Sequence, residues 1–212
     1  MTPRPLSAAE TFDTIGIRYQ QGYSHLPEQL AAIDWLLDRL PAAATVLDIG
    51  SGTGKPTAEL LAAAGHRVTG CDVSPTMVDL ARQQVPSARF DRADVRELPD
   101  IPGRWDAITA FFPLMQMSHA DLDNTVTRIA GWLKPGGYFV FCTVPFAGEL
   151  EDAIYLGLPV QASSYSKDEF LRLFARAGLT VLHAQESTFQ PDLAEATPER
   201  HLFVYATRDL RP

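Results

Sequence analysis

The sequence predicts an α/β protein with a doubly wound, mostly parallel sheet and helices on both faces. Apolar, strand-like segments alternate with helical periodicities along the chain. The stretch Val46–Gly54, VLDIGSGTG, places a short apolar run directly before a glycine-rich turn, which is typical of a buried strand that leads into a helix. With 212 residues, 46% of them hydrophobic, the chain is long enough for one such domain and short for two.

The N-terminal segment 1–40 is expected to form lid helices. Ser7 and Glu10 have the S-x-x-E spacing of a capping box, and apolar residues recur at helical spacing over 11–23. A second apolar stripe over 27–40 lies between two prolines and predicts another helix.

The central segment 45–144 contains the glycine-rich turn and is expected to be the cofactor-binding core, and strand and helix patterns alternate along it. Ser74-Pro75 marks one helix start, and Lys134-Pro135-Gly136-Gly137 predicts a turn. The expected strands are 46–49, 67–71, 88–92, 105–111 and 138–144, and the expected helices are 55–64, 75–84 and 118–133.

Two further segments complete the single domain. Residues 145–165 lack periodicity and contain glycine and proline, so we expect an irregular insertion, with at most one short helix, on the substrate side. Residues 166–208 predict a capped helix over 167–177, followed by strands over 179–187 and 201–208 that pair as an antiparallel edge.

The glycine turn and a downstream carboxylate predict a cofactor site. Asp72 ends the next strand and lies 22 residues after Gly50, near the spacing of about 20 expected for a carboxylate that binds ribose hydroxyls. The loop reads GxGxG, because Lys55 stands where a dinucleotide fingerprint has its third glycine. This departure weakens the pyrophosphate interpretation, and an ordinary strand-to-helix turn is the alternative.

These motifs resemble those of class I S-adenosylmethionine-dependent methyltransferases. The similar stretches are VLDIGSGTG, GCDVSPTMVDLAR and the pair Asp94-Val95, and the resemblance covers Thr45 to about Val144. It implies a Rossmann-like, seven-stranded sheet whose last strand is inserted antiparallel. It also implies S-adenosylmethionine as the cofactor and methyl transfer to the O, N or C atom of a small molecule.

The resemblance further implies the roles of individual residues. Gly50 and Gly52 are expected to pass under the methionine part of the cofactor, Asp72 to bind both ribose hydroxyls, and Asp94 with the Val95 amide to meet the adenine. The Phe111 carbonyl would face the methionine amino group. The full set of expected cofactor residues is Tyr19, Asp48, Gly50, Ser51, Gly52, Asp72, Val73, Met77, Asp94, Val95, Phe111 and Gln116.

Several of these residues have simpler interpretations. Asp72 could only favour a helix N-terminus, Asp94 could belong to a solvated polar turn, and Met77 could be a core residue. The tyrosines of the N-terminal segment, Tyr19 and Tyr23, could equally pack in the core.

The acceptor side is predicted from the lid and the insertion. Tyr23, Phe146 and Tyr155 are the expected substrate-binding residues, because aromatic side chains commonly line small-ligand pockets. His25 and His119 are the candidate general bases, although precise positioning of the acceptor can supply much of the rate without a base. No set of metal ligands is recognised, so no metal is expected.

Composition and charge limit the classes of partner and the cell compartment that we expect for this protein. The net charge of −8 argues against a nucleic-acid partner, and Phe111-Phe112-Pro113-Leu114 differs from the (N/D/S)PP(Y/F) box of enzymes that methylate bases. Cys71 and Cys142 lie in apolar strands and are expected to be core thiols in a cytoplasmic protein. Neither a signal segment nor a membrane span is recognised. A non-methylating cofactor-binding protein, or an enzyme acting on a macromolecule, is the alternative function.

Overall fold

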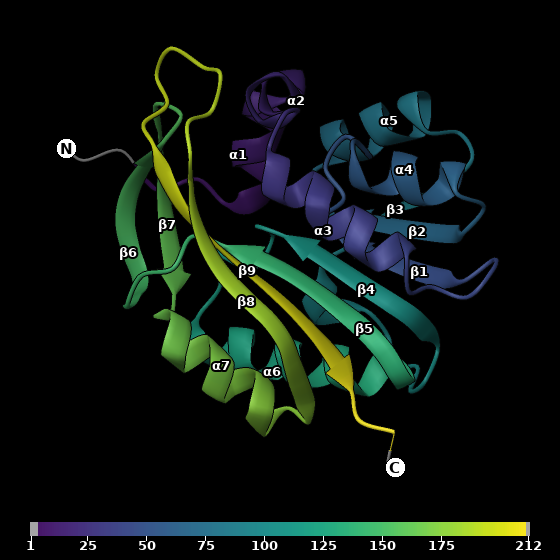
Figure 1. Cartoon of the computed structure of the whole chain (residues 1–212). Coiled ribbons are helices and arrows are strands. Elements are labelled where there is room, and N and C mark those ends of the chain that lie inside the picture. Colours follow the sequence, from purple (N-terminus) through teal and green to yellow (C-terminus); the bar gives the residue numbers. More distant parts are fainter. Residues whose placement is uncertain (1–3, 211–212) are drawn as a thin grey trace.

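A seven-stranded sheet forms the centre of the computed structural model, which describes residues 4–210 (Figure 1). The strand order is β3-β2-β1-β4-β5-β9-β8. The strands are β1 (Thr45–Ile49), β2 (Arg67–Asp72), β3 (Arg89–Arg92), β4 (Trp105–Phe111), β5 (Leu133–Thr143), β8 (Leu179–Phe189) and β9 (Glu199–Arg208).

The five strands β1 to β5 pair in parallel with their neighbours in the sheet, whereas β9 runs antiparallel to both β5 and β8. The predicted seven-stranded sheet, with its last strand inserted antiparallel, is therefore confirmed. The parallel pairing has a functional consequence, because the carboxyl ends of β1, β2 and β4 meet at the same edge of the sheet.

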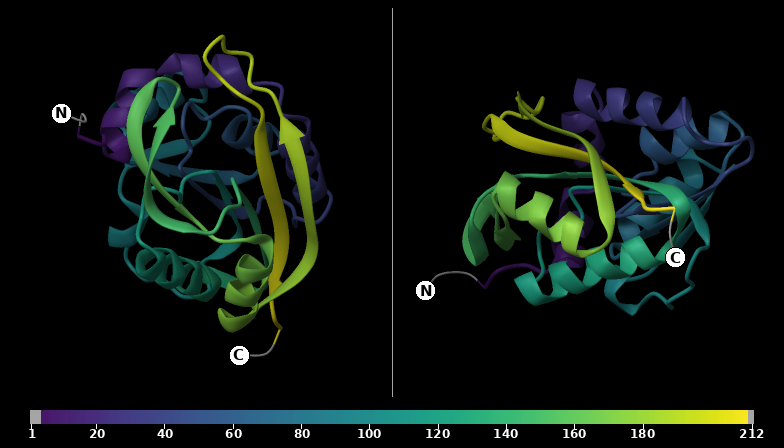
Figure 2. Two further views of the ribbon diagram at one scale, coloured as in Figure 1. Left: turned by 90° about the vertical axis from the view of Figure 1, so that its left-hand side faces the viewer. Right: turned by 60° about the horizontal axis from the view of Figure 1, so that its bottom comes forward.

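Helices cover both faces of the sheet, as Figures 1 and 2 show. One layer consists of α3 (Pro27–Leu37), α4 (Thr57–Ala63) and α5 (Pro75–Gln84), and the other of α6 (His119–Trp132) and α7 (Lys167–Arg176). Neighbouring residues of β1 serve opposite cores, because Val46 packs with α3, α4 and α5 whereas Leu47 packs with α6 and α7. This arrangement explains why the strand reads as a continuous apolar run instead of an alternating one.

The N-terminal helices lie at the carboxyl edge of the sheet and are shorter than predicted. The helix expected over 11–23 divides into α1 (Ala8–Ile15) and α2 (Ile17–Tyr23). Gly16 causes the break, because its φ of +53° cannot continue a helix. Phe12 of α1 and Tyr19 of α2 still pack edge to face across this break, with ring centroids 5.5 Å apart.

The insertion over 145–165 is ordered, which corrects the expectation of an irregular segment with a short helix. It forms an antiparallel hairpin of β6 (Gly148–Tyr155) and β7 (Leu158–Ser164). The turn residues Leu156 and Gly157 both have positive φ, the geometry of a tight hairpin turn. Most of β6 is exposed and three of its eight residues are acidic, so the strand lacks the apolar alternation that predicts a half-buried strand.

The predicted turn at Lys134–Gly137 is also corrected, because α6 ends at Trp132 and β5 begins at once with Leu133. The register of the β4-β5 pair shifts within this stretch, because Trp105 pairs with Leu133 whereas Ala107 pairs with Tyr138.

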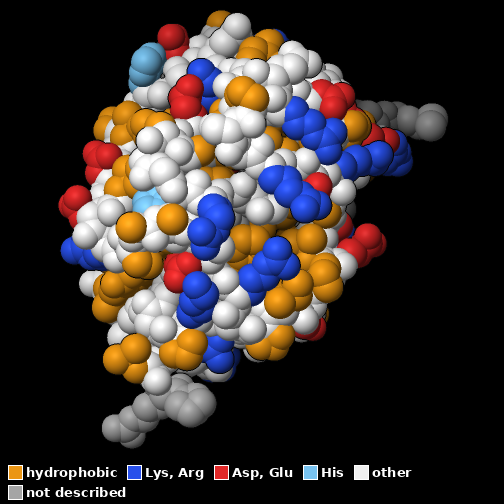
Figure 3. Space-filling view, turned by 90° about the vertical axis from the view of Figure 1, so that its right-hand side faces the viewer, with side chains coloured by type: hydrophobic (Ala, Val, Ile, Leu, Met, Phe, Trp, Pro, Cys, Tyr) orange, Lys and Arg blue, Asp and Glu red, His pale blue; other side chains and the backbone are white. Residues whose placement is uncertain are grey.

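Charge is distributed unevenly over the surface. Arg67 and Arg89 are exposed at the first residues of β2 and β3, and Arg104 is exposed just before β4, so all three lie at the edge opposite the carboxyl ends. Figure 3 shows several Lys and Arg side chains on that side of the molecule. Arginines that are scattered in the sequence are thus brought to one side by the parallel strand order. Among residues 4–210, no helix has the length and hydrophobicity needed to cross a bilayer.

Candidate functional site

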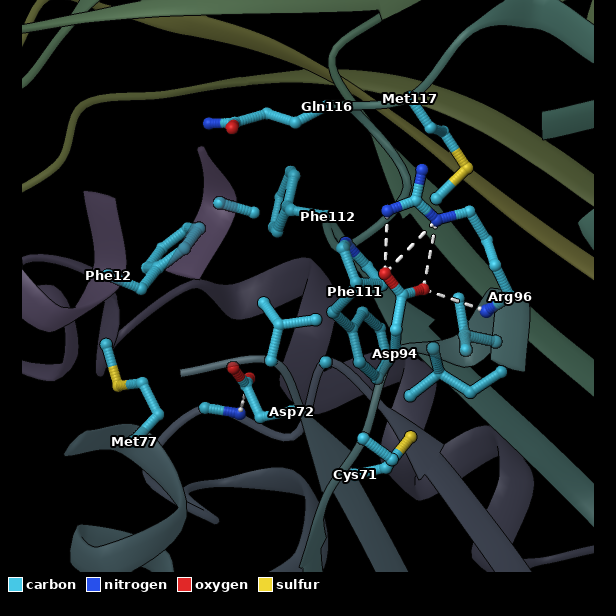
Figure 4. A pocket seen from close by; sticks show the side chains of 18 of the residues that line it. Phe12, Cys71, Asp72, Met77, Asp94, Arg96, Phe111, Phe112, Gln116 and Met117 are labelled. Carbon is cyan, nitrogen blue, oxygen red and sulfur yellow. Dashed lines mark hydrogen bonds and ion pairs between the residues drawn. The ribbon is translucent and has the colours of Figure 1, made fainter. Parts of the chain in front are cut away.

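A cavity opens where the carboxyl ends of β1, β2 and β4 meet the N-terminal helices (Figure 4). The loops that follow these strands form its floor, and α1 and α2 close it from above. Ten of the twelve predicted cofactor residues line this cavity: Tyr19, Gly50, Gly52, Asp72, Val73, Met77, Asp94, Val95, Phe111 and Gln116. The remaining two, Asp48 and Ser51, line a smaller adjoining hollow.

The two first glycines of the loop serve different purposes. A Cβ atom on Gly50 would lie 2.2 Å from the Cβ of Pro113, so this glycine permits close packing of the loop after β4. A Cβ atom on Gly52 would meet no protein atom within 4 Å. The space beside Gly52 is therefore open for a ligand that approaches the backbone directly.

Asp72 is held at the end of β2 by backbone amides. Its Oδ2 accepts a hydrogen bond from the Gly52 N–H at 2.9 Å, and its Oδ1 accepts one from the Ser74 N–H at 2.9 Å. Burial raises the pKa of the Asp72 carboxyl, and these amides oppose that effect. Each oxygen keeps a lone pair beyond the amide contact, which suits a carboxylate that accepts from two vicinal hydroxyls.

Asp94 combines a structural contact with a place in the cavity wall. It caps the short 3-10 helix η1 (Val95–Glu97), and its two oxygens form a bidentate ion pair with the Arg96 guanidinium at 3.0 and 2.6 Å. The Arg96 guanidinium holds the pKa of the Asp94 carboxyl below its ordinary value. Asp94 thus both caps η1 and lines the cavity, and its position beside the Val95 amide leaves it able to accept from an exocyclic amino group.

The adjoining hollow contains buried oxygen atoms that lack protein partners. Thr109 donates its hydroxyl to Asp48 Oδ1 at 2.7 Å, but Asp48 Oδ2 has no hydrogen-bond partner among the described residues. Ser51 Oγ in the same hollow is likewise unpartnered. Burial raises the pKa of Asp48 to about 7. Buried oxygens without partners are costly, so this hollow suits a ligand that brings N–H donors and positive charge.

Apolar side chains close the rest of the cavity. Figure 4 shows Phe12 from α1 and Phe111 and Phe112 from the end of β4 around its centre, with Met77 on the side of α5. Met77 is fully buried, as the core interpretation expects, and it also borders the cavity. Phe112 has a φ of +68°, which is unusual for a residue with a side chain and marks a constrained position beside the site.

The predicted substrate residues divide into two locations. Tyr23 and Tyr155 meet behind the cavity wall, where the Tyr155 hydroxyl donates to the Tyr23 hydroxyl at 3.1 Å. Tyr23 stacks on the cavity residue Tyr19, with ring centroids 4.7 Å apart. The structure does not bring Phe146 to them, because it lies in a separate surface depression with Lys167 and Arg200.

Neither predicted base lines the cavity. His25 is exposed between α2 and α3. His119 Nε2 lies 2.9 Å from the Gly148 carbonyl and 3.0 Å from the Ser164 carbonyl, and its ring stacks on Tyr165. These contacts require a proton on Nε2 that is donated to backbone, so His119 anchors the β6-β7 hairpin to α6.

A histidine that the sequence analysis passed over lies closer to the site. His201 on β9 is fully buried and packs edge-on against Phe112, with ring centroids 4.6 Å apart. Its Nε2 is 3.0 Å from Glu199 Oε2. The pattern Glu199-Arg200-His201 at the start of a strand is the signal that was available, because residues two apart share one face of a strand.

Comparisons with known proteins agree with this geometry. Residues 46–137 match the family model described as a methyltransferase domain. Over 169 residues, 73% of this chain, the sequence is 31% identical to methyltransferase GfsG of Streptomyces halstedii. It is 27% identical to the O-methyltransferase cnsE of Penicillium expansum over 207 residues, which cover 85% of this chain and 74% of that protein.

A solved structure shows the same fold. It is the 1,6-didemethyltoxoflavin-N1-methyltransferase of Burkholderia thailandensis, determined with 1,6-didemethyltoxoflavin and S-adenosylhomocysteine bound. The TM-score is 0.70 at 23% sequence identity, over 98% of this chain and 93% of that one. This chain spans only 60% of GfsG and as little as 30% of another of the first curated relatives.

Proposed function

Because the chain belongs to the class I S-adenosylmethionine-dependent methyltransferases, we propose that it binds S-adenosylmethionine and catalyses transfer of the sulfonium methyl group to a small-molecule acceptor. The observation that carries the proposal is the pairing of Asp72 with the open space beside Gly52. Asp72 is anchored by backbone amides, and it lies beside a glycine whose missing side chain leaves open space. Both residues lie at the carboxyl ends of two parallel strands. This combination fits an adenosine ribose better than it fits any need of the fold.

Each part of the cofactor has suitable residues. Asp72 would accept from the ribose hydroxyls, Asp94 and the Val95 amide would hold the adenine edge, and Met77 would pack against the ring. The amino group of the methionine part would donate to Asp48 Oδ2, whose missing partner the ligand would supply. When bound, the cofactor supplies an electrophilic methyl group, and the residues of the chain supply position and exclusion of water.

The charge of the cavity favours an acceptor without several carboxylates. Among the described residues that line the main cavity, Arg96 is the only cationic side chain, and it is already paired with Asp94. A polyanionic acceptor would therefore be buried without cations to neutralise it, which is costly. A small neutral or weakly basic molecule fits these walls better.

Cofactor binding is tested by calorimetric titration of the purified protein with S-adenosylmethionine, S-adenosylhomocysteine and NAD. We expect the two sulfur-containing ligands to bind in the micromolar range and NAD not to bind. Binding of NAD alone would refute the proposal, because the glycine loop would then serve a dinucleotide.

Turnover is tested by incubating the protein with S-adenosylmethionine and pooled small metabolites, and by measuring S-adenosylhomocysteine with mass spectrometry. Methylated products in the small-molecule pools support the proposal. Tight cofactor binding with product only when protein or nucleic acid is added would instead support a macromolecular acceptor. Binding with no methyl transfer to any of them would support a non-methylating member of the fold.

A further inference from the structure

A buried chain of polar side chains lies behind the aromatic wall of the cavity. The Tyr155 hydroxyl donates to the Tyr23 hydroxyl at 3.1 Å, and the Tyr23 hydroxyl donates to Glu199 Oε1 at 2.7 Å. His201 Nε2 lies 3.0 Å from the other oxygen, Glu199 Oε2. We call Tyr155, Tyr23, Glu199 and His201 the relay. Its members come from the hairpin, α2 and β9, so tertiary folding alone assembles it.

The hydrogen bonds of the relay have a fixed direction. A carboxylate only accepts, so the Tyr23 hydroxyl and the His201 Nε2–H must both donate to Glu199. Tyr23 has then used its proton, and Tyr155 must be the donor in the contact between the two tyrosines. Two lone pairs are left at the ends of the relay: one on the Tyr155 oxygen, and one on His201 Nδ1, which is buried without a partner among the described residues.

The relay is adjacent to the cavity on the side of the lid. Tyr23 stacks on Tyr19, the Phe12 ring is 6.3 Å from that of Tyr155, and the Phe112 ring is 4.6 Å from that of His201. Tyr19, Phe12 and Phe112 all line the cavity. The relay therefore lies directly behind these three rings, and no relay residue lines the cavity itself.

Packing alone does not explain the relay. His201 is fully buried and Tyr23 nearly so, and the Glu199 side chain is 19% exposed. Enclosing a carboxylate and an imidazole among aromatic rings is costly, and apolar residues of similar size would serve the core as well. Burial also raises the pKa of both Tyr23 and Tyr155, so these hydroxyls stay protonated and can pass a proton without becoming phenolates.

We propose that the relay accepts the proton released when a hydroxyl or N–H acceptor is methylated, with the acceptor displacing the Phe12 ring to contact Tyr155 and with Glu199 receiving the proton. This inference rests on the proposed methyl transfer. In that reaction the X–H electron pair of the acceptor forms the new X–C bond, the S–C electron pair stays on sulfur, and one proton leaves. The proton moves to the Tyr155 oxygen as the Tyr155 proton moves to Tyr23 and the Tyr23 proton moves to Glu199. From Glu199 it reaches solvent through the exposed part of the carboxyl.

The relay also selects the class of acceptor. A carboxylate acceptor has already lost its proton at neutral pH and needs no proton acceptor, and it would be repelled by Glu199. Neutral phenols, alcohols and N–H compounds have a proton to give and carry no opposing charge. The relay therefore assigns the site to neutral protic acceptors.

The first test is independent of turnover. In protein with 15N-labelled histidine, long-range proton–nitrogen spectra report the tautomer of His201, whose signals are assigned by their loss in His201→Gln. We expect the Nε2–H form, with Nδ1 unprotonated, and a change to the Nδ1–H form in Glu199→Gln. A wild-type protein that already holds the proton on Nδ1 would overturn the direction of the relay.

The second test uses probe acceptors in matched pairs: phenol with benzoate, and 4-methoxyphenol with 4-methoxybenzoate. We expect S-adenosylhomocysteine to form with the phenols only. Turnover of the benzoates, or of neither series by protein that binds S-adenosylmethionine, would overturn the assigned class. Protein that fails to bind S-adenosylmethionine at all would instead refute the proposed function.

Variants then test the direction of proton flow. Glu199→Gln keeps the size of the side chain and should lower kcat by about 10²- to 10⁴-fold, with KM and cofactor affinity unchanged. Tyr155→Phe should lower kcat while leaving the contact between Tyr23 and Glu199 intact. Glu186→Gln is the matched control, since Glu186 lies on β8 outside the relay and pairs with Arg200.

The pH profile separates a proton acceptor from a structural group. The titratable groups around Glu199 are His201 on its own strand, Tyr19 and Tyr23 on α2, Tyr155 on the hairpin and Cys142 on β5. Wild type and Glu199→Gln should differ in the pH profile of kcat at an unchanged melting temperature, because the variant lacks the proton acceptor. The same pH profile in both proteins, or an unaltered kcat in Glu199→Gln, would overturn the proposal.

Discussion

Replacing Asp48 by asparagine should stabilise the protein without ligand and weaken its binding of S-adenosylmethionine. Asp48 is 2% exposed and has one hydrogen bond, from Thr109, while its second oxygen is unpartnered. Asparagine has the same shape and can still accept from Thr109 through its amide oxygen. The substitution thus removes a buried charge and keeps the packing.

The sign and the size of the effect follow from the pKa of Asp48, which burial raises from 3.8 to about 7. Between these values the folded state holds a proton that the unfolded state has lost, so the free energy of unfolding falls as pH rises through this window. A difference of about three pKa units corresponds to at most about 4 kcal/mol. Asp48→Asn should therefore be close to neutral at pH 4 and stabilising at pH 8, by up to about 10 °C in melting temperature for a chain of this length.

Thermal melts of wild type and variant from pH 4 to pH 8 measure this difference. Asp106→Asn is the matched control with the opposite sign. Burial raises the pKa of the Asp106 carboxyl, but its hydrogen bonds from Lys134 and Thr45 outweigh burial and lower that pKa. The control should therefore destabilise at pH 8. Equal melting curves for wild type and Asp48→Asn at pH 8 would refute the assignment of a costly buried charge.

The same carboxylate should make cofactor binding depend on pH. Wild-type affinity for S-adenosylmethionine, measured by calorimetry, should increase as pH rises through about 7 and Asp48 becomes ionised, because the amino group would then meet a carboxylate. Asp48→Asn should show little dependence over this range. A variant that binds the cofactor as tightly as wild type at pH 8 would place the methionine amino group elsewhere.

Three further predictions concern the cofactor site and its lid. Asp72→Ala should weaken binding of S-adenosylmethionine by about 1 to 3 kcal/mol in calorimetry, the cost of leaving a diol unpaired, and unchanged affinity would move the ribose elsewhere. Gly52→Ala and Gly65→Ala both add a Cβ atom at positive φ with no protein atom within 4 Å, so each should lower stability by about 1 kcal/mol in thermal melts. Only the former should abolish cofactor binding, and equal affinity in the two variants would contradict the open space as a ligand site. Asp13→Ala removes the contact from lid helix α1 to the Ser74 hydroxyl at 2.6 Å, and should speed cofactor release in stopped-flow measurements, whereas an unchanged rate would mean that this contact does not hold the lid.

The sequence by itself determined the α/β class and the strand ends that line the cavity. Gly50, Gly52 and Asp72 are recognisable because each stands within a few residues of a strand end, where a local pattern carries the information. Parallel strand order then brings these ends together, since all carboxyl ends of parallel strands share one edge. This is why ten of the twelve expected cofactor residues line one cavity.

Other features were decided only by the tertiary structure. Strand β6 of the hairpin is mostly exposed and carries three acidic residues, so no apolar alternation could predict it. Tyr23 and Glu199 are separated by 176 positions in the chain, and their contact exists because α2 packs beside the start of β9. The His119 ring forms a hydrogen bond with the Gly148 carbonyl of the hairpin, and the His201 ring is buried against Phe112. Local patterns encode where strands and helices begin and end, whereas contacts between distant side chains depend on how the completed layers pack. The sequence alone therefore determined the strand ends that line the cavity, and only the folded structure decided which polar groups lie behind its aromatic wall.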